Sequence, residues 1–283
     1  MGAVRWAIIM NTSSGDRVFA GSIPQLYEQY LVPLIFDSYA RDVSYRVAAL
    51  APSAVLEIAA GTGVVTRQLA ARLSADVAIV STDLNQAMLD HAASVGTSRA
   101  VTWRQADAMN LPFGDSTFDV VVCQFGTMFF PDKAAAFAET RRVLRPGGTF
   151  LFNVWDRIED NEFADCVTQA VAGLLPSDPP RFLARLPHGY YDQAVIRGAL
   201  VDGGFTGSIV FDTVAVQSRA ESPRSVAIAY CQGTPLRNEL EGRDASILNE
   251  ATDIATAAIK ERFGAGPVTG KIQAHVISAA REV

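Results

Sequence analysis

The 283-residue chain has few cysteines and lacks any long apolar run. Its three cysteines, Cys123, Cys166 and Cys231, lie too far apart for a metal-binding motif or a disulfide framework. We therefore expect no bound metal and a reducing, cytoplasmic location. No apolar stretch approaches the ~20 residues that cross a membrane, so no membrane partner is expected.

An excess of basic residues is also missing. The chain has 24 Lys and Arg against 30 Asp and Glu, which gives a net charge of −6. Without a Lys/Arg stripe, this charge argues against a nucleic-acid partner. By contrast, 49% of the residues are hydrophobic, enough for a substantial core.

The N-terminal residues do not form a convincing targeting signal. A short apolar run follows Arg5, and a polar run begins at Asn11. The apolar run is too short for a signal peptide and has no cleavage site. We expect residues 1–21 to be a flexible leader, with Met10 as an alternative start.

The following segments alternate between predicted helices and strands. Residues 22–52 have helical periodicity that Pro33 is expected to divide into two helices. Further along, helices are expected near residues 64–73, 85–94, 132–144, 160–175 and 191–203, and across most of 222–263. Strands are expected near residues 53–59, 77–82, 101–105, 118–123, 148–155, 207–217 and 267–279. Alternation through residue 155 indicates an α/β fold with parallel strands and crossover helices.

Residues 53–66 read as a buried strand that ends in a glycine turn before a helix. Gly61 and Gly63 have no Cβ, so a ligand could approach the backbone closely. Glu57 precedes the first glycine by four residues, where a carboxylate would repel phosphates. The pattern therefore favours a ligand with a cationic amino group and no phosphate.

Other candidate ligand-binding residues follow later strands. Asp83, at the end of the second strand, could bind both hydroxyls of a ribose or cap the next helix. Leu84 and Met88 could flank an adenine ring or pack in the core. Beyond the fourth strand, Phe125, Met128 and Phe129 could line a substrate pocket or form an apolar loop.

Glu57-x-Ala59-x-Gly61-x-Gly63 resembles motif I of the S-adenosylmethionine-dependent methyltransferases with a Rossmann-like fold. Alanine replaces the first glycine of the usual motif, which makes a positive φ at position 59 unexpected. Asp107-Ala108 and the turn at residues 145–148 also match the family. The resemblance spans about residues 53–155 and is similar to the ubiquinone/menaquinone-biosynthesis branch, of the methyltransferase type 11 kind.

This resemblance implies a seven-stranded, mostly parallel sheet with helices on both faces. It assigns residues 53–221 and 264–283 to the methyltransferase core, after N-terminal helices at 22–52. Residues 222–263 become a helical insertion between the last two strands. That insertion could act as a lid or as a dimer surface in a possible homodimer.

The resemblance also implies S-adenosylmethionine as cofactor, S-adenosylhomocysteine as product and an unidentified small-molecule acceptor. Asp107 and Ala108 would read the adenine edge, and Gln124 would lie near the methionyl group. Tyr27 and Tyr30 could close over the cofactor. The implied cofactor-binding residues are Glu57, Ala59, Gly61, Gly63, Asp83, Leu84, Met88, Asp107, Ala108 and Gln124.

Two other functions remain open at this point, and no catalytic residue is assigned. An NAD(P)-dependent oxidoreductase would also suit Asp83, although Glu57 opposes it and Thr66 stands where a third glycine or alanine is needed. A non-catalytic cofactor-binding module is the second. Of the histidines, only His188 lies on a predicted loop from which it could reach the pocket.

Overall fold

The computed structural model describes residues 22–244 and 246–283. The leader expected at residues 1–21, including Met10, lies outside those residues. Among the described helices, none combines the length and the apolar composition that a membrane span requires.

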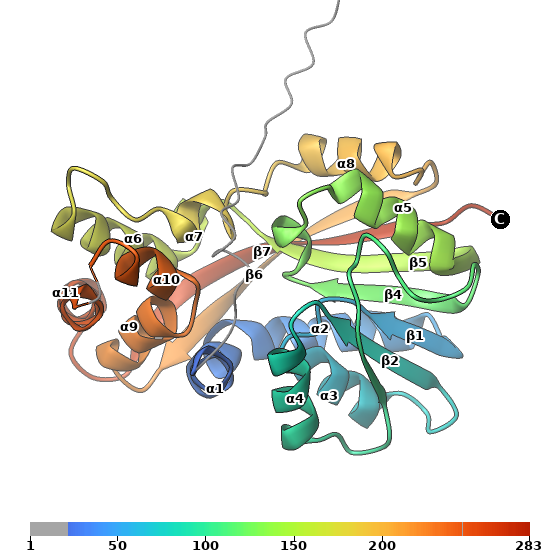
Figure 1. Ribbon diagram of the computed structural model, residues 1–283, viewed down its shortest axis with the longest axis horizontal. Helices are drawn as coiled ribbons and strands as arrows, with labels where there is room; N and C mark the ends of the chain where they lie inside the picture. Colours follow the sequence, from blue (N-terminus) through green and yellow to red (C-terminus); the bar gives the residue numbers. More distant parts are fainter. Residues whose placement is uncertain (1–21, 245) are drawn as a thin grey trace, which may run out of the picture.

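A single seven-stranded sheet organises the fold, in the order β3-β2-β1-β4-β5-β7-β6 (Figure 1). The first five strands are parallel, and β7 runs antiparallel to both of its neighbours. This confirms the predicted fold class. The strands are β1 (Ala54–Glu57), β2 (Ala78–Asp83), β3 (Thr102–Gln105), β4 (Phe118–Gln124), β5 (Leu144–Trp155), β6 (Ile209–Ala220) and β7 (Val268–Ala280).

Helices cover both faces of this sheet. Helices α2, α3 and α4 lie on one side of the sheet, and α5 and α8 lie on the other (Figure 1). Between them, the apolar runs of the central strands β1 and β4 are almost completely buried, as expected for a sheet covered on both faces. These helices are α2 (Asp37–Ala49), α3 (Val64–Arg72), α4 (Gln86–Val95), α5 (Lys133–Val143) and α8 (Gln193–Asp202).

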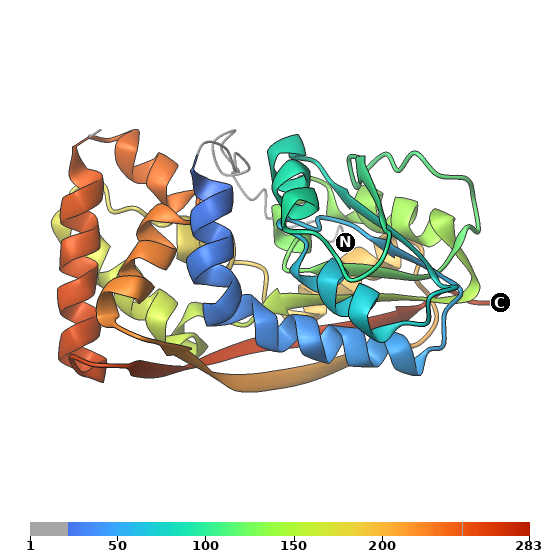
Figure 2. The same cartoon turned by 90° about the horizontal axis from the view of Figure 1, so that it is seen from below.

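The predicted break at Pro33 is wrong. Helix α1 (Ile23–Leu26) continues into a π-helix, η2 (Tyr27–Phe36), which contains Pro33. Proline has no N–H and its ring clashes with the carbonyl four residues earlier, so a wider π-type turn accommodates it better than an α-helical turn. The chain bends after Phe36, where α2 begins (Figure 2).

The segment between β6 and β7 folds as three helices, with a break at the predicted residues 233–235. They are α9 (Pro223–Gln232), α10 (Leu236–Glu241) and α11 (Ile247–Phe263). Helix α11 packs against α9 and α6 (Glu162–Leu174). Its Ile247, Ala251, Ala255 and Ile259 are buried there, so this apolar face belongs to the core of the chain.

The turn after β1 is held from both sides by neighbouring strands. The N–H of Ile58 donates to the Val122 carbonyl, and the N–H of Ala60 donates to the Thr82 carbonyl, each at 2.9 Å. Between these anchors Ala59 has a φ of +54°, so the expectation that alanine would avoid a positive φ is wrong. Tertiary hydrogen bonds impose a conformation that alanine alone disfavours.

Ala59→Gly should therefore raise the free energy of unfolding by about 0.5–1 kcal/mol. Relief of the left-handed backbone is worth about 1–2 kcal/mol, and the entropy of glycine offsets about 0.5–1 kcal/mol of that gain. Urea denaturation measures the change as a higher midpoint at an unchanged slope. Ala60→Gly is the matched control and should lower stability, because Ala60 has no positive φ to relieve. Equal losses in both variants would contradict this account.

Candidate functional site

A cavity opens at the carboxyl ends of β1, β2 and β4, the edge where parallel α/β sheets bind ligands. Its empty volume, including the open mouth, is about 870 Å³. Many of the predicted residues meet here although they come from separate segments. Those that line it are Tyr27, Ala59, Gly61, Asp83, Leu84, Met88, Asp107, Ala108, Gln124, Phe125 and Phe129.

Asp83 joins the end of β2 to the glycine turn. One carboxylate oxygen accepts a hydrogen bond from the Gly61 N–H at 2.9 Å, and the other accepts from the Asn85 N–H at 2.8 Å. Burial raises the pKa of Asp83, and these hydrogen bonds partly offset the rise. Asn85, and not Asp83, occupies the N-cap position of α4. The oxygen bonded to the Asn85 N–H also accepts from the Asn85 side-chain amide at 3.4 Å, so the oxygen bonded to Gly61 is the one that keeps a lone pair for a ligand hydroxyl.

The loop after β3 forms another wall of the cavity. Asp107 accepts a hydrogen bond from the Met109 N–H at 2.9 Å, and its carbonyl accepts one from the Asn110 N–H at 3.0 Å. These bonds fix a tight loop that holds Asp107 and Ala108 at the cavity. Leu84, which is exposed, and Met88, which is buried, also line the cavity and add apolar surface to it.

Gln124, the last residue of β4, carries an unpaired acceptor. Its Nε2 donates to the Phe36 carbonyl at 3.3 Å, but its buried Oε1 has no hydrogen-bond partner among the described residues. A buried amide oxygen without a donor is costly. A ligand that presents an N–H group to this part of the cavity would remove that cost.

Glu57, a predicted cofactor-binding residue, is not among the residues that line this cavity. Its carboxylate accepts hydrogen bonds from Thr66 and Ser81, at the start of α3 and within β2. Burial raises the pKa of Glu57 to about 7, and the hydrogen bonds from Thr66 and Ser81 counteract part of the rise. Glu57 therefore links β1, β2 and α3 beneath the turn.

Gly63 also lies away from the cavity. It has a φ of +81°, and a Cβ at this position would come within 2.9 Å of the Trp103 ring. Gly126, which the sequence did not indicate, does line the cavity, and a Cβ there would lie 2.5 Å from that of Ala59. The absence of a Cβ lets Gly63 pack against Trp103 and Gly126 pack against Ala59. Ala59 is distant from Gly126 in sequence, so the sequence alone did not indicate that position 126 requires a glycine.

Two predicted pocket residues line neither this cavity nor the neighbouring one described below. Met128 is fully buried in the core, and Tyr30 is half-buried beside it. Tyr27, one turn before Tyr30, does reach the cavity and stacks on Phe36 with ring centroids 4.9 Å apart.

A second cavity, with about 490 Å³ of empty volume, lies next to the first. Tyr27, Phe125 and Phe129 line both, and His188 lines the second. Most of the other residues that line it come from η2, α7 (Phe182–Arg185) and the α9–α10 region. No sequence pattern indicated them, because these segments are far apart along the chain. Those residues are Leu31, Ile35, Phe36, Trp155, Phe182, Leu183, Pro187, Tyr230, Thr234 and Pro235.

Comparison with known proteins gives concordant matches. Residues 56–152 match the family described as methyltransferase domain. The chain is 32% identical over 168 residues to the ubiquinone/menaquinone biosynthesis C-methyltransferase UbiE of Marinomonas sp. (strain MWYL1). That alignment covers 55% of this chain and 67% of the relative.

Solved structures share the fold at low sequence identity. Phosphoethanolamine N-methyltransferase 2 of Haemonchus contortus, in complex with phosphomonomethylethanolamine and S-adenosylhomocysteine, has a TM-score of 0.58 at 18% identity. The match covers 96% of this chain and 61% of that one. The YcgJ protein of Bacillus subtilis has a TM-score of 0.54 at 19% identity, covering 87% and 99% of the two chains. At such identities the likeness establishes the fold alone.

The raised pKa of Glu57 predicts a pH-dependent stability. Folding takes up a proton between the ordinary pKa of 4.5 and the folded value of about 7. The contribution of Glu57 to the free energy of unfolding should therefore fall as the pH rises through this window. Relative to Glu57→Gln, the wild type should lose stability between pH 4.5 and pH 7 and stay level above it. Urea denaturation of both proteins across this range measures the difference, in which all other titrating groups cancel. A difference that does not change with pH would contradict the prediction.

Proposed function

This chain belongs to the S-adenosylmethionine-dependent methyltransferases with a Rossmann-like fold, and we propose that it transfers the cofactor's methyl group to a small molecule in the second cavity. The family assignment rests on the methyltransferase match at 32% identity and on the shared fold. The observation that supports the proposed cofactor site most is the meeting of Gly61, Asp83 and Asp107 at one cavity.

The lining residues suit the parts of S-adenosylmethionine. Asp83 offers acceptors to the ribose hydroxyls, and Asp107 with Ala108 offers a polar edge to the adenine. The buried Gln124 Oε1, which lacks a donor among the described residues, suits the ammonium group of the methionyl part. Glycine at position 61 leaves open space above the backbone. These features replace the contact with Glu57 that the sequence had suggested.

The bound cofactor supplies a methyl group made electrophilic by the adjacent sulfonium. The protein's task is then to align the acceptor with that methyl group and to exclude water. Tyr27, Phe125 and Phe129 line both cavities and so form the boundary at which acceptor and cofactor would meet. No catalytic base is required of this chain for an acceptor that ionises readily.

We assign the inserted helices a covering role over the acceptor. Tyr230 of α9, with Thr234 and Pro235 of the α9–α10 break, lines the second cavity. The matched methyltransferase-domain region ends at residue 152, before these segments begin. Acceptor choice would therefore depend on a part of the chain outside that region.

A single glycine substitution tests the cofactor site. Gly61→Arg should weaken S-adenosylhomocysteine binding by at least about a hundredfold, or about 2.7 kcal/mol, because its side chain would occupy the open space at the turn. Isothermal titration calorimetry measures the affinity, and circular dichroism checks the fold.

Gly96→Arg is the matched control. Gly96 also has a positive φ and open space where a Cβ would lie, but it is not among the residues that line the cavity. It should cost similar stability and leave the affinity unchanged. Full affinity in Gly61→Arg would contradict the assigned site. A thermal shift of the wild type with NAD but none with S-adenosylhomocysteine would instead support the oxidoreductase alternative.

A further inference from the structure

The walls of the second cavity are mostly aromatic and apolar, and the described residues that line it include no Asp, Glu, Lys or Arg. Phe125 stacks on Trp155 at 3.8 Å between ring centroids, with the planes only 6° apart. A charged acceptor would lose its hydration here without meeting an opposite charge, which is strongly unfavourable. A neutral, flat molecule matches these walls.

His188 is a polar group in this apolar surrounding, and its tautomer is fixed. Its Nδ1 lies 2.9 Å from the main-chain carbonyl of Asp156. Because a carbonyl oxygen can only accept, Nδ1 must carry the proton. Burial lowers the pKa of His188 to about 4, so the ring is neutral at pH 7. Nε2 therefore keeps a lone pair and can only accept a hydrogen bond.

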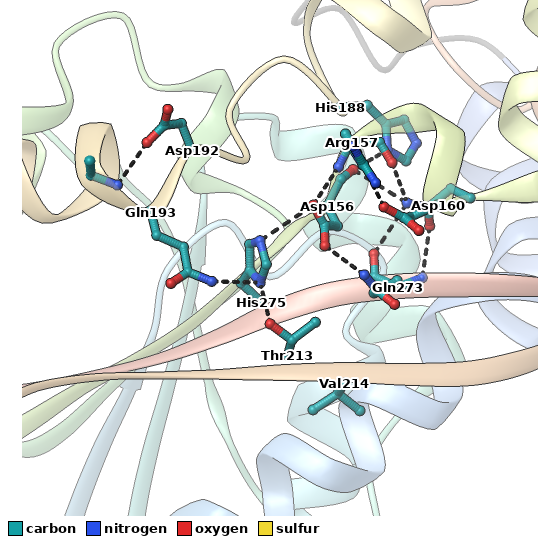
Figure 3. Close-up of polar contacts among 12 residues, drawn as sticks. Asp156, Arg157, Asp160, His188, Asp192, Gln193, Thr213, Val214, Gln273 and His275 are labelled. Carbon is teal, nitrogen blue, oxygen red and sulfur yellow. Dashed lines mark hydrogen bonds and ion pairs between the residues drawn. The ribbon is translucent and has the colours of Figure 1, made fainter.

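The carbonyl that fixes this tautomer is itself held firmly (Figure 3). The Asp156 carboxylate accepts from the Arg157 N–H at 2.8 Å and from Gln273 Nε2 at 2.7 Å. It also lies 3.4 Å from Nε2 of His275 on β7. Asn161 donates a second hydrogen bond to the same carbonyl at 3.3 Å. Contacts to β7 and to the residues around α6 thus anchor the group that orients His188.

Thr234 is another polar residue of the cavity, and its hydroxyl group already forms hydrogen bonds within the protein. Its hydroxyl donates to the Tyr230 carbonyl at 2.7 Å and accepts from the Leu236 N–H at 3.1 Å. His188 differs, because one of its two ring nitrogens has a protein partner and the other can serve a ligand.

We propose that His188 determines acceptor specificity: the second cavity takes a neutral aromatic molecule whose hydroxyl or N–H donates a hydrogen bond to His188 Nε2. This inference rests on the proposed function only where it calls the bound molecule the methyl acceptor; the binding of that molecule to His188 does not depend on it. A ring with so low a pKa is a poor proton acceptor, so His188 orients the acceptor and does not deprotonate it.

Three probes with one ring system test the proposal: 2-naphthol, naphthalene and 2-naphthoate. Quenching of tryptophan fluorescence, to which Trp155 in the cavity wall contributes, reports binding in the presence of saturating S-adenosylhomocysteine. The wild type should bind 2-naphthol about tenfold more tightly than naphthalene, as one net hydrogen bond allows, and should not bind 2-naphthoate.

His188→Phe should abolish the preference for 2-naphthol and leave naphthalene binding unchanged. His188→Asn provides a second variant, because its amide can still donate toward the Asp156 carbonyl while Nε2 is removed. His91→Phe, on α4 and away from both cavities, is the matched control and should keep the tenfold preference. Circular dichroism verifies the fold of each variant.

Three outcomes would overturn the proposal. The first is a preference for 2-naphthol over naphthalene that survives in both His188 variants. The second is an equal loss of affinity for 2-naphthol and for naphthalene in those variants. The third is a preference that Tyr230→Phe abolishes while the His188 variants keep it. Calorimetry with S-adenosylhomocysteine separates this test from that of the cofactor site. If S-adenosylhomocysteine does not bind, the proposed function fails. The comparison of 2-naphthol with naphthalene, made in the absence of S-adenosylhomocysteine, then still tests the role of His188.

Discussion

The hydrogen bond from the Gly61 N–H to the Asp83 carboxylate is the contact on which the candidate site depends. It joins the turn after β1 to the end of β2, and the bond from Ala60 to the Thr82 carbonyl lies beside it. Together they set the floor of the cavity where the parallel strands end. A loose turn here would separate the backbone of Gly61 from the Asp83 carboxylate that lines the cavity with it.

Two buried carboxyl groups near this turn have different roles although burial raises the pKa of both. Glu57 meets Thr66 and Ser81 and ties two strands to a helix beneath the turn. Asp83 is bonded to backbone N–H groups and still lines the cavity. Hydrogen bonds partly offset the burial of each group, and of the two only Asp83 lines the cavity. Glu57 thus stabilises the elements beneath the turn, and Asp83 bonds to the turn and lines the cavity.

The two cavities arise from different parts of the chain. The first is built on the parallel strands and the loops that follow them, which the family match covers. The second takes its walls mainly from η2, the segment around His188 and the break between α9 and α10. Tyr27, Phe125 and Phe129 connect them. Under the proposed function, such a division would let the cofactor site stay constant while acceptor recognition changes with the added segments.

The sequence alone determined the strands and helices of residues 53–155, because apolar runs and turn residues are local signals. It also placed Asp83, Asp107 and Gly61 at one edge, since parallel strands end together. Only the tertiary structure decided the left-handed Ala59, which hydrogen bonds to β2 and β4 impose, and the inward position of Glu57. It alone brought Trp155, Phe36 and His188 around a second cavity. Those residues are more than thirty positions apart along the chain, and their meeting depends on how helices pack over the sheet, which no local pattern encodes.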